Sequence, residues 1–236
     1  LKADLISARK NLPAPKALGE EGLLGKWDAA HLEPDAGRFC LTGDLTITAK
    51  IRTKQAVANI ASKYDWPGKQ RSYVFGVGGE GDEEGRPGHL FFWASARTDP
   101  YQGVAIHGSR AINDDRDHDV ALVFKAGKSV RLFVDGIEDT EARVIGKPPG
   151  SIAVANRPLA IGGGYKNSPK PNAHRFEGSL TEVRLYDRAL ELIPESEEIQ
   201  KLQLALHKID DKQSAASREV PAVPVMKERT SPRQTF

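Results

Sequence analysis

The sequence predicts an all-β fold, an antiparallel β-sandwich formed by roughly residues 23–190. Residues 45–52 alternate between apolar and polar side chains, which is the pattern of a strand with one buried face. Residues 119–124 form an almost continuous apolar run, which suits a strand in the middle of a sheet. Between Leu41 and Tyr186, short candidate strands alternate with turn residues and show no helical repeat, which favours a sandwich.

Further strands are predicted in order along the same region. Asp135-Gly136 follows an alternating segment and accepts positive φ, so it predicts a two-residue hairpin turn. Gly162-Gly163-Gly164 predicts a bend, and a final strand closes the domain. The remaining predicted strands cover residues 57–63, 72–77, 89–95, 130–134, 159–161 and 180–186.

The segments on either side of the sandwich have a different character. Residues 1–22 form an N-terminal flank with a short amphipathic helical stretch, and residues 191–212 carry an apolar helical face that predicts a C-terminal helix. Residues 213–236 are polar and rich in proline, as in a linker or tail to a following domain. Because the chain starts at Leu1, we expect it to be a piece of a larger protein.

Composition argues against several classes of partner. The net charge of +2 gives no electrostatic reason to expect binding to nucleic acid. No apolar run approaches the length that a membrane-spanning helix needs, so we expect no membrane insertion of this segment. Cys40 is the single cysteine, which excludes an internal disulfide.

Three motifs, in the right order, resemble the laminin-G-like, concanavalin A-like jelly-roll domains. Residues 39–49 are similar to the opening strand of that family, residues 132–136 to its central hairpin, and residues 176–190 to its closing strand. The resemblance implies an antiparallel jelly-roll β-sandwich. It also implies a non-catalytic module that recognises carbohydrate or a neighbouring domain.

A second resemblance concerns the tail. Residues 223–236 are similar to a connector of large exported planctomycete proteins that also contain a c-type cytochrome domain. This resemblance implies an exported, periplasmic or cell-envelope location. It also implies that the partners are a polysaccharide or other domains of the same parent protein.

Aromatic strands provide the candidate ligand site. In residues 89–95, Leu90, Phe92 and Ala94 are predicted to face the core, so that the alternate side chains face outward. An outer face with large aromatic side chains suits a sugar ring or a partner protein. Alternatively, residues 1–30 or 191–236 fold back and cover it. The predicted ligand-binding residues are Arg71, Tyr73, His89, Phe91 and Trp93.

Calcium is the one cofactor that the sequence suggests. Asp114, Asp115 and Asp117 form an oxygen-rich loop that predicts either a calcium site or an ordinary capped turn. The family resemblance implies a calcium ligand in the closing strand, where an Asp is usual. Here that position is Thr181, whose neutral hydroxyl is a poorer calcium ligand than a carboxylate.

Catalysis is the least favoured interpretation, and we expect no enzyme activity. A laminarinase-type glycoside hydrolase of this fold places its acids on a strand, with apolar residues between them that anchor the core. Residues 80–84 contain the acids but lack the apolar residues, so a solvated loop is predicted. His107, His118 and His174 are predicted to be scattered loop histidines. A third alternative is an architectural insert that binds no ligand.

Overall fold

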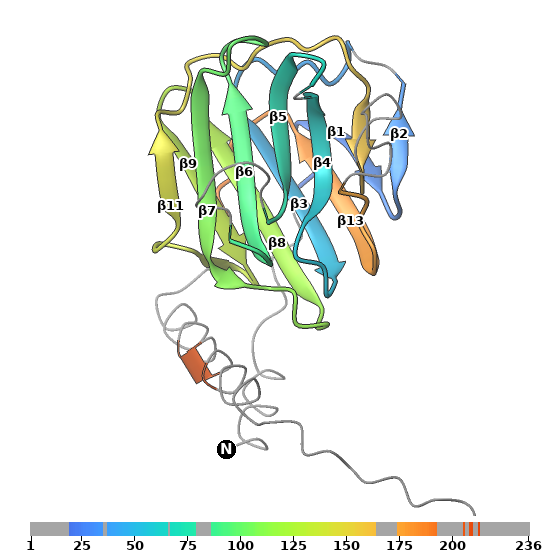
Figure 1. Ribbon diagram of the computed structural model, residues 1–236, viewed down its shortest axis with the longest axis vertical. Coiled ribbons are helices and arrows are strands. Elements are labelled where there is room, and N and C mark those ends of the chain that lie inside the picture. Colours follow the sequence, from blue (N-terminus) through green and yellow to red (C-terminus); the bar gives the residue numbers. More distant parts are fainter. Residues whose placement is uncertain are drawn as a thin grey trace, which may run out of the picture.

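The computed structural model describes residues 19–34, 37–65, 67–78, 86–163 and 174–192, together with Ala205, Lys208, Ile209 and Lys212. Two antiparallel sheets pack face to face as a jelly-roll β-sandwich, which confirms the predicted fold class (Figure 1). One sheet has the order β1-β13-β3-β8-β9-β10 and the other β11-β7-β6-β5-β4-β12-β2. The strands are β1 Leu23–Trp27, β2 His31–Glu33, β3 Leu45–Arg52, β4 Ala58–Asp65, β5 Gln70–Val77, β6 His89–Ser95, β7 Gly103–Ala111, β8 His118–Lys125, β9 Ser129–Val134, β10 Ile137–Glu138, β11 Arg143–Gly146, β12 Leu159–Ile161 and β13 Ser179–Tyr186.

The strands predicted from alternation are present in the structure. β3 covers the predicted residues 45–52, and the apolar run after Asp119 lies in β8, which pairs with β3 on one side and β9 on the other. Asp135 and Gly136 have φ values of 53° and 79°, and Val134 pairs with Ile137 across them. The two-residue hairpin is therefore confirmed, with both turn residues in the left-handed region that such turns require.

β7 is the most important strand that the sequence pattern did not indicate. Its inward residues Val104 and Ile106 are buried in the core, but glycines and polar residues around them conceal the alternation. His107 lies on this strand and is buried, and His118 begins β8. The prediction that these two histidines lie on loops is therefore wrong. β1, β2 and β11 were also not predicted.

The core fills the space between the two sheets. Side chains from alternate positions of both sheets meet there, as in the tilted pair of Phe92 and Phe124, whose ring centroids are 5.9 Å apart. At the upper end of the sandwich as drawn in Figure 1, a segment before β12 crosses between the sheets. Its Ile152 amide donates to the Thr42 carbonyl before β3 of one sheet, and its Ala153 amide donates to the Ser95 carbonyl at the end of β6 in the other sheet. This upper end is thus closed by hydrogen-bonded chain.

The residues that follow β13 cover the outer face of the six-stranded sheet. The Thr46 hydroxyl donates to the Arg188 carbonyl at 2.7 Å and accepts from the Leu190 amide at 3.0 Å. Ala189 and Leu192 pack there on a small apolar cluster formed by Ala121, Val123 and Phe133. The C-terminal flank therefore covers a different sheet from the one that carries Trp93, at least as far as Leu192.

Several sequence predictions concern residues beyond those described. The acidic residues 80–84, the N-terminal flank up to residue 18 and the tail 213–236 all lie outside the described residues. Of the predicted helix 191–212, Glu191 and Leu192 are described and are not helical, whereas Ala205, Lys208, Ile209 and Lys212 are described and are helical. The division of the chain into four segments therefore stays a prediction. Within the described residues, no helix is long and apolar enough to cross a membrane.

Candidate functional site

An aromatic cluster lies on the outer face of the seven-stranded sheet. Leu90, Phe92 and Ala94 of β6 point into the core as predicted, so Phe91 and Trp93 point outward. Trp93 contacts Phe91 edge to face at 5.4 Å between ring centroids and contacts Tyr64 of β4 in the same way at 6.0 Å. Edge-to-face pairs are a favoured arrangement of aromatic rings and hold the indole in place.

Small neighbours on the adjacent strands make room for these rings. Trp93 pairs with Ala105 of β7 on one side, and Phe91 pairs with Gly76 of β5. A Cβ atom on Gly76 would come within 2.9 Å of the Phe91 ring. The Phe91 ring therefore packs against the sheet and is only 4% exposed, whereas Trp93 is half-buried. The surface of the cluster is formed by Trp93 and Tyr64, and the buried Phe91 packs against Trp93.

Two polar atoms at this face are buried and lack a partner. The indole Nε1 of Trp93 and the hydroxyl of Ser72 on β5 make no hydrogen bond within the part of the chain that the structure describes. A buried donor that stays unpaired costs about 1–3 kcal/mol. A ligand oxygen that accepted from Trp93 would remove that cost, so this atom is suited to a polar ligand.

Charged residues form the rim of the cluster at the upper end. The Arg71 guanidinium binds the Asp99 carboxylate and donates to the Thr98 carbonyl at 3.2 Å. The Lys69 ammonium lies 3.1 Å from the same carboxylate. Hydrogen bonds from Arg71 and then Lys69 hold the pKa of Asp99 below its usual value. Asp99 therefore remains ionised and keeps the two cations beside the aromatic rings.

Tyr64 connects this rim with the aromatic rings. It pairs with Arg71 across β4 and β5. Burial, and then the nearby Tyr101, raise the pKa of Tyr64, and Arg71 opposes the increase. Tyr64 therefore stays a neutral hydroxyl at all ordinary pH values. Tyr101, from the loop between β6 and β7, is the fourth aromatic residue of this group.

The structure brings together only part of the predicted ligand set. Arg71 and Tyr73 do lie on the strand next to β6, and Arg71 joins the rim of the cluster. Tyr73, however, is fully buried in the core, and its hydroxyl donates to the Phe39 carbonyl at 3.2 Å. The expected outward orientation of Tyr73 is therefore wrong, because Tyr73 pairs with the inward-facing Ala94.

His89 also lies apart from the cluster. It is on the same face of β6 as Trp93 but four residues earlier, which is about 13 Å along a strand. Tyr64 and Tyr101 were not predicted. A bulge in β4 between Ser62 and Tyr64 breaks the alternation there, so the pattern alone did not show which way Tyr64 faces.

The three aspartates proposed for calcium do not converge. Asp114 binds Arg116 and His118, through a 2.7 Å hydrogen bond from Arg116 Nε and a 3.0 Å contact with His118 Nε2. Asp115 instead pairs with Lys54 at 3.1 Å. Among the described residues, no group of three acidic, histidine or cysteine side chains could hold a metal ion. The loop is arranged as a network of ion pairs.

A cationic side chain of the neighbouring strand β3, that of Lys50, lies beside the position in the closing strand where the family resemblance implies calcium. An open cavity of about 360 Å³ lies there, lined by Lys50, Ile51, Asp117, His118, Asp119, Ser179 and Thr181. Lys50 pairs with Thr181 on one neighbouring strand and Asp119 on the other. Its ammonium lies 2.9 Å from Glu182, beside a bulge in β13. A hydrogen bond that the Lys50 ammonium donates to Glu182, then the charge of Asp119, raise the pKa of Lys50. These residues do not fit a calcium ion, because the lysine already supplies the positive charge.

Several solved structures are similar to this chain at low sequence identity. Domains LG4-5 of the mouse laminin alpha1 chain match with a TM-score of 0.46 and 15% identity, over 76% of this chain and 47% of that one. This chain thus spans about half the length of the laminin fragment. The CBM40 domain of the Ruminococcus gnavus IT-sialidase, solved with alpha2,3 sialyllactose, matches with a TM-score of 0.49 and 14% identity, over 72% and 95%. A SAP-like pentraxin of Limulus polyphemus matches with a TM-score of 0.43 and 13% identity, over 73% and 75%.

Sequence comparisons assign the family. Among curated proteins, none matches the chain significantly. A laminin-G-type family model matches residues 25–193, which include every strand from β2 to β13 and most of β1. The match covers well over half of the chain and agrees with the observed sandwich. The chain therefore belongs to the concanavalin A-like lectin/glucanases superfamily.

Proposed function

We propose that this domain is a non-catalytic carbohydrate-binding module whose ligand lies on Trp93, Tyr64 and Tyr101. The proposal rests chiefly on the half-buried indole of Trp93, whose buried Nε1 donor has no acceptor among the described residues. A pyranose ring presents C–H groups to an aromatic face and hydroxyl oxygens at its edge. One pyranose ring placed against Trp93 would cover the apolar face of the indole and provide an acceptor for its Nε1 donor.

The carboxylates near the cluster support a binding role over hydrolysis. Glycoside hydrolysis needs one carboxyl group that remains protonated as a general acid and a second that acts as nucleophile or base. Asp99 is held ionised by Arg71 and Lys69, and Asp65 binds Arg157 at 2.6 Å. Both are occupied by guanidinium groups and are poorly suited to proton transfer. The laminarinase-type alternative rests on residues 80–84, which lie outside the described residues.

The wider setting is also part of this proposal. The resemblance of residues 223–236 to connectors of exported planctomycete proteins supports an exported, periplasmic or cell-envelope location. In that setting the partners are a polysaccharide and the other domains of a larger parent protein. Membership of a laminin-G-type family agrees with an extracellular role.

Titration with polysaccharides tests the proposal. We expect calorimetric binding of at least one polysaccharide, reduced at least tenfold by Trp93→Ala, because the apolar contact and the donor are lost together. His89→Ala is the matched control, since His89 lies on the same face of β6 but outside the cluster. Equal affinity of Trp93→Ala and the parent chain would contradict the site. Release of reducing sugar from a bound polysaccharide would instead favour a hydrolase.

One observation favours a second candidate, the architectural insert. Phe91 and Val74 are each only 4% exposed although both lie on the outer face of the seven-stranded sheet. Part of that face is therefore closed within the chain itself. A folded protein that binds none of a broad panel of polysaccharides would support this alternative.

A further inference from the structure

Basic residues gather at the end of the sandwich that carries the aromatic cluster. Building on the proposed carbohydrate-binding function, we propose that the ligand is an anionic polysaccharide, one with carboxylate or sulfate groups. The proposal goes beyond carbohydrate binding in general, because it assigns the sign of the ligand charge and the residues that select it.

Three chain segments meet at this upper end. They are residues 63–71 around the turn between β4 and β5, residues 95–102 between β6 and β7, and residues 153–158 before β12. Hydrogen bonds join them, from the Asn156 amide to Gln70 Oε1 at 3.1 Å and from the Ala153 amide to the Ser95 carbonyl at 2.7 Å. Side chains on these segments therefore act on one region of the surface.

The three segments carry more positive than negative charge. Two aspartates are present, and an arginine binds each of them: Arg157 binds Asp65, and Arg71 binds Asp99. Three further cations remain beyond these two pairs, which leaves an excess of three positive charges. The three further cations are Lys63, Lys69 and Arg97.

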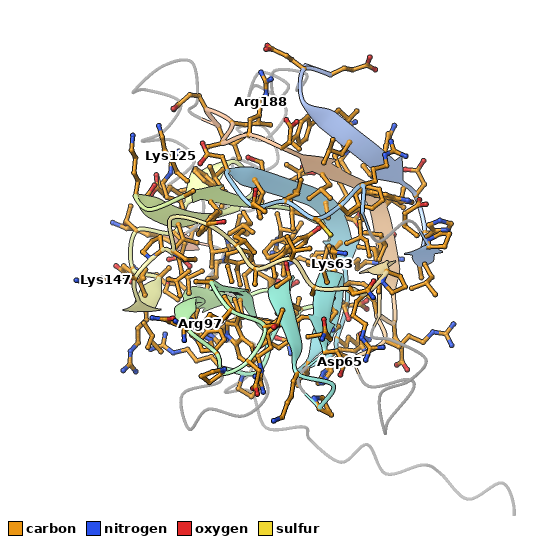
Figure 2. The ribbon with its side chains drawn as sticks, turned by 90° about the horizontal axis from the view of Figure 1, so that it is seen from above. Lys63, Asp65, Arg97, Lys125, Lys147 and Arg188 are labelled. Atoms are coloured by element: carbon orange, nitrogen blue, oxygen red, sulfur yellow. The ribbon has the colours of Figure 1, made fainter. Side chains whose placement is uncertain are left out.

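Two of the three excess cations are accessible to a ligand. The Lys69 side chain is 69% exposed, and Arg97 is exposed on the loop that leaves β6. Lys63 is fully buried and donates to the Arg157 carbonyl at 2.5 Å, so it makes no contact with a ligand. Figure 2 looks onto this end of the sandwich, with Arg97 and two further basic residues, Lys125 and Lys147, labelled around it.

The opposite end of the sandwich has the opposite sign. Residues 112–119 contain four aspartates and a single arginine, residues 135–139 contain three acids without a lysine or arginine, and residues 50–54 beside them contain three cations, so the acids exceed the cations by three. The net charge of +2 therefore conceals two ends of unlike charge. An anionic chain is attracted to the upper end and repelled from the lower one, which directs it to the aromatic cluster.

The expected size of the effect follows from the position of the charges. Arg97 comes four residues after Trp93, so its charge lies roughly 13 Å from a ring bound there. At that distance in water, one pair of unit charges changes affinity by roughly 1.7-fold. Removing Lys69 and Arg97 together should weaken binding by about threefold for each ligand charge held near the cluster.

Matched polymers and variants test the proposal on the full chain. Dextran and dextran sulfate share a backbone, as do methyl-esterified and free polygalacturonate, so each pair isolates the anionic group. We expect tighter calorimetric binding of at least one anionic member than of its neutral counterpart, and weaker binding as salt rises from about 20 mM to about 300 mM. The double variant Lys69→Gln/Arg97→Gln should lose at least about threefold in affinity for that anionic polymer. Lys54→Gln, at the lower end and 76% exposed, should keep it.

The outcomes separate this proposal from the proposed function. Equal or tighter binding of the neutral polymers, lost in Trp93→Ala, overturns the anionic ligand and leaves the carbohydrate-binding site standing. Anionic binding that is insensitive to Trp93→Ala, or equally weakened by Lys54→Gln, shows nonspecific attraction and overturns the proposal. Binding of none of the four polymers overturns it as well, and a neutral polysaccharide from a broader panel then decides the proposed function.

Discussion

His118 offers the sharpest test of how the lower end of the sandwich is held together. Its side chain is 4% exposed and lies between two carboxylates: Nδ1 is 3.0 Å from Asp135 and Nε2 is 3.0 Å from Asp114. Asp135 belongs to the turn between β9 and β10, and Asp114 to the loop before β8. One imidazolium thus connects β8 with two separate loops.

The substitution His118→Leu removes both contacts while keeping a side chain of similar size. A hydrogen bond to a charged group contributes about 1.5–3 kcal/mol. The two carboxylates are 16% and 33% exposed, so water replaces part of what is lost. We therefore expect a loss of about 2–4 kcal/mol in the free energy of unfolding. His31→Leu is the control, because His31 is half exposed and should change stability by less than about 0.5 kcal/mol.

The effect should depend on pH in a defined direction. Burial opposes protonation of His118, but the hydrogen bonds that it donates to Asp135 and Asp114, together with the negative charges of these two carboxylates, outweigh burial and raise the pKa of His118 above 6.5. The folded state therefore holds the proton more tightly than the unfolded state. This contribution is complete below about pH 6.5 and is lost as pH rises through the folded-state pKa.

Acid should remove the other half of the interaction. Burial works against ionisation of Asp114, but hydrogen bonds from Arg116 and His118 outweigh it and lower its pKa below 3.8. The contribution of Asp114 is therefore present above about pH 3.8 and is lost as pH falls through its folded-state pKa. Together the two groups stabilise the fold most between about pH 4 and pH 6.5.

Urea unfolding of the parent chain and both variants, at about pH 6 and about pH 9, measures these differences. The gap between the parent chain and His118→Leu should be larger at the lower pH. Unchanged stability of His118→Leu at about pH 6 would refute the conclusion that His118 stabilises the fold through Asp114 and Asp135. A gap that is the same at both pH values would show that the imidazole acts without its charge.

Three further predictions follow from other contacts. The melting temperature of the parent chain should be the same with calcium and with a chelator, because Lys50 supplies the positive charge beside β13; a calcium-dependent shift would contradict this. Gly103→Ala should lower the free energy of unfolding, measured by urea titration, by more than about 2 kcal/mol, because its Cβ would come within 1.8 Å of the Ala94 carbonyl oxygen. Full stability would show that β7 shifts to accommodate the added methyl group. Thr46→Val should lower the free energy of unfolding by about 1–2 kcal/mol and accelerate proteolysis after β13, because the Thr46 hydroxyl binds the backbone of Arg188 and Leu190. An unchanged cleavage rate would show that the packing of Leu192 alone holds this segment on the sheet.

Local sequence pattern was enough for much of the fold. The alternation of β6 showed that Leu90 and Phe92 point inward and Phe91 and Trp93 outward, because successive side chains of a strand face opposite sides. Asp135-Gly136 indicated its turn because few other dipeptides accept positive φ at both positions. These properties depend on neighbouring residues alone, so the sequence by itself determined them.

Tertiary structure decided which side chains meet. Tyr64 reaches Trp93 only because β4, β5 and β6 are adjacent and a bulge in β4 changes the alternation. Tyr73 lies in the core through its register with Ala94, and Leu192 packs on the six-stranded sheet through contacts with residues far away in sequence. Strand order, register and bulges arise from pairing between distant segments. A repeat of two residues within one strand contains no information about its neighbours.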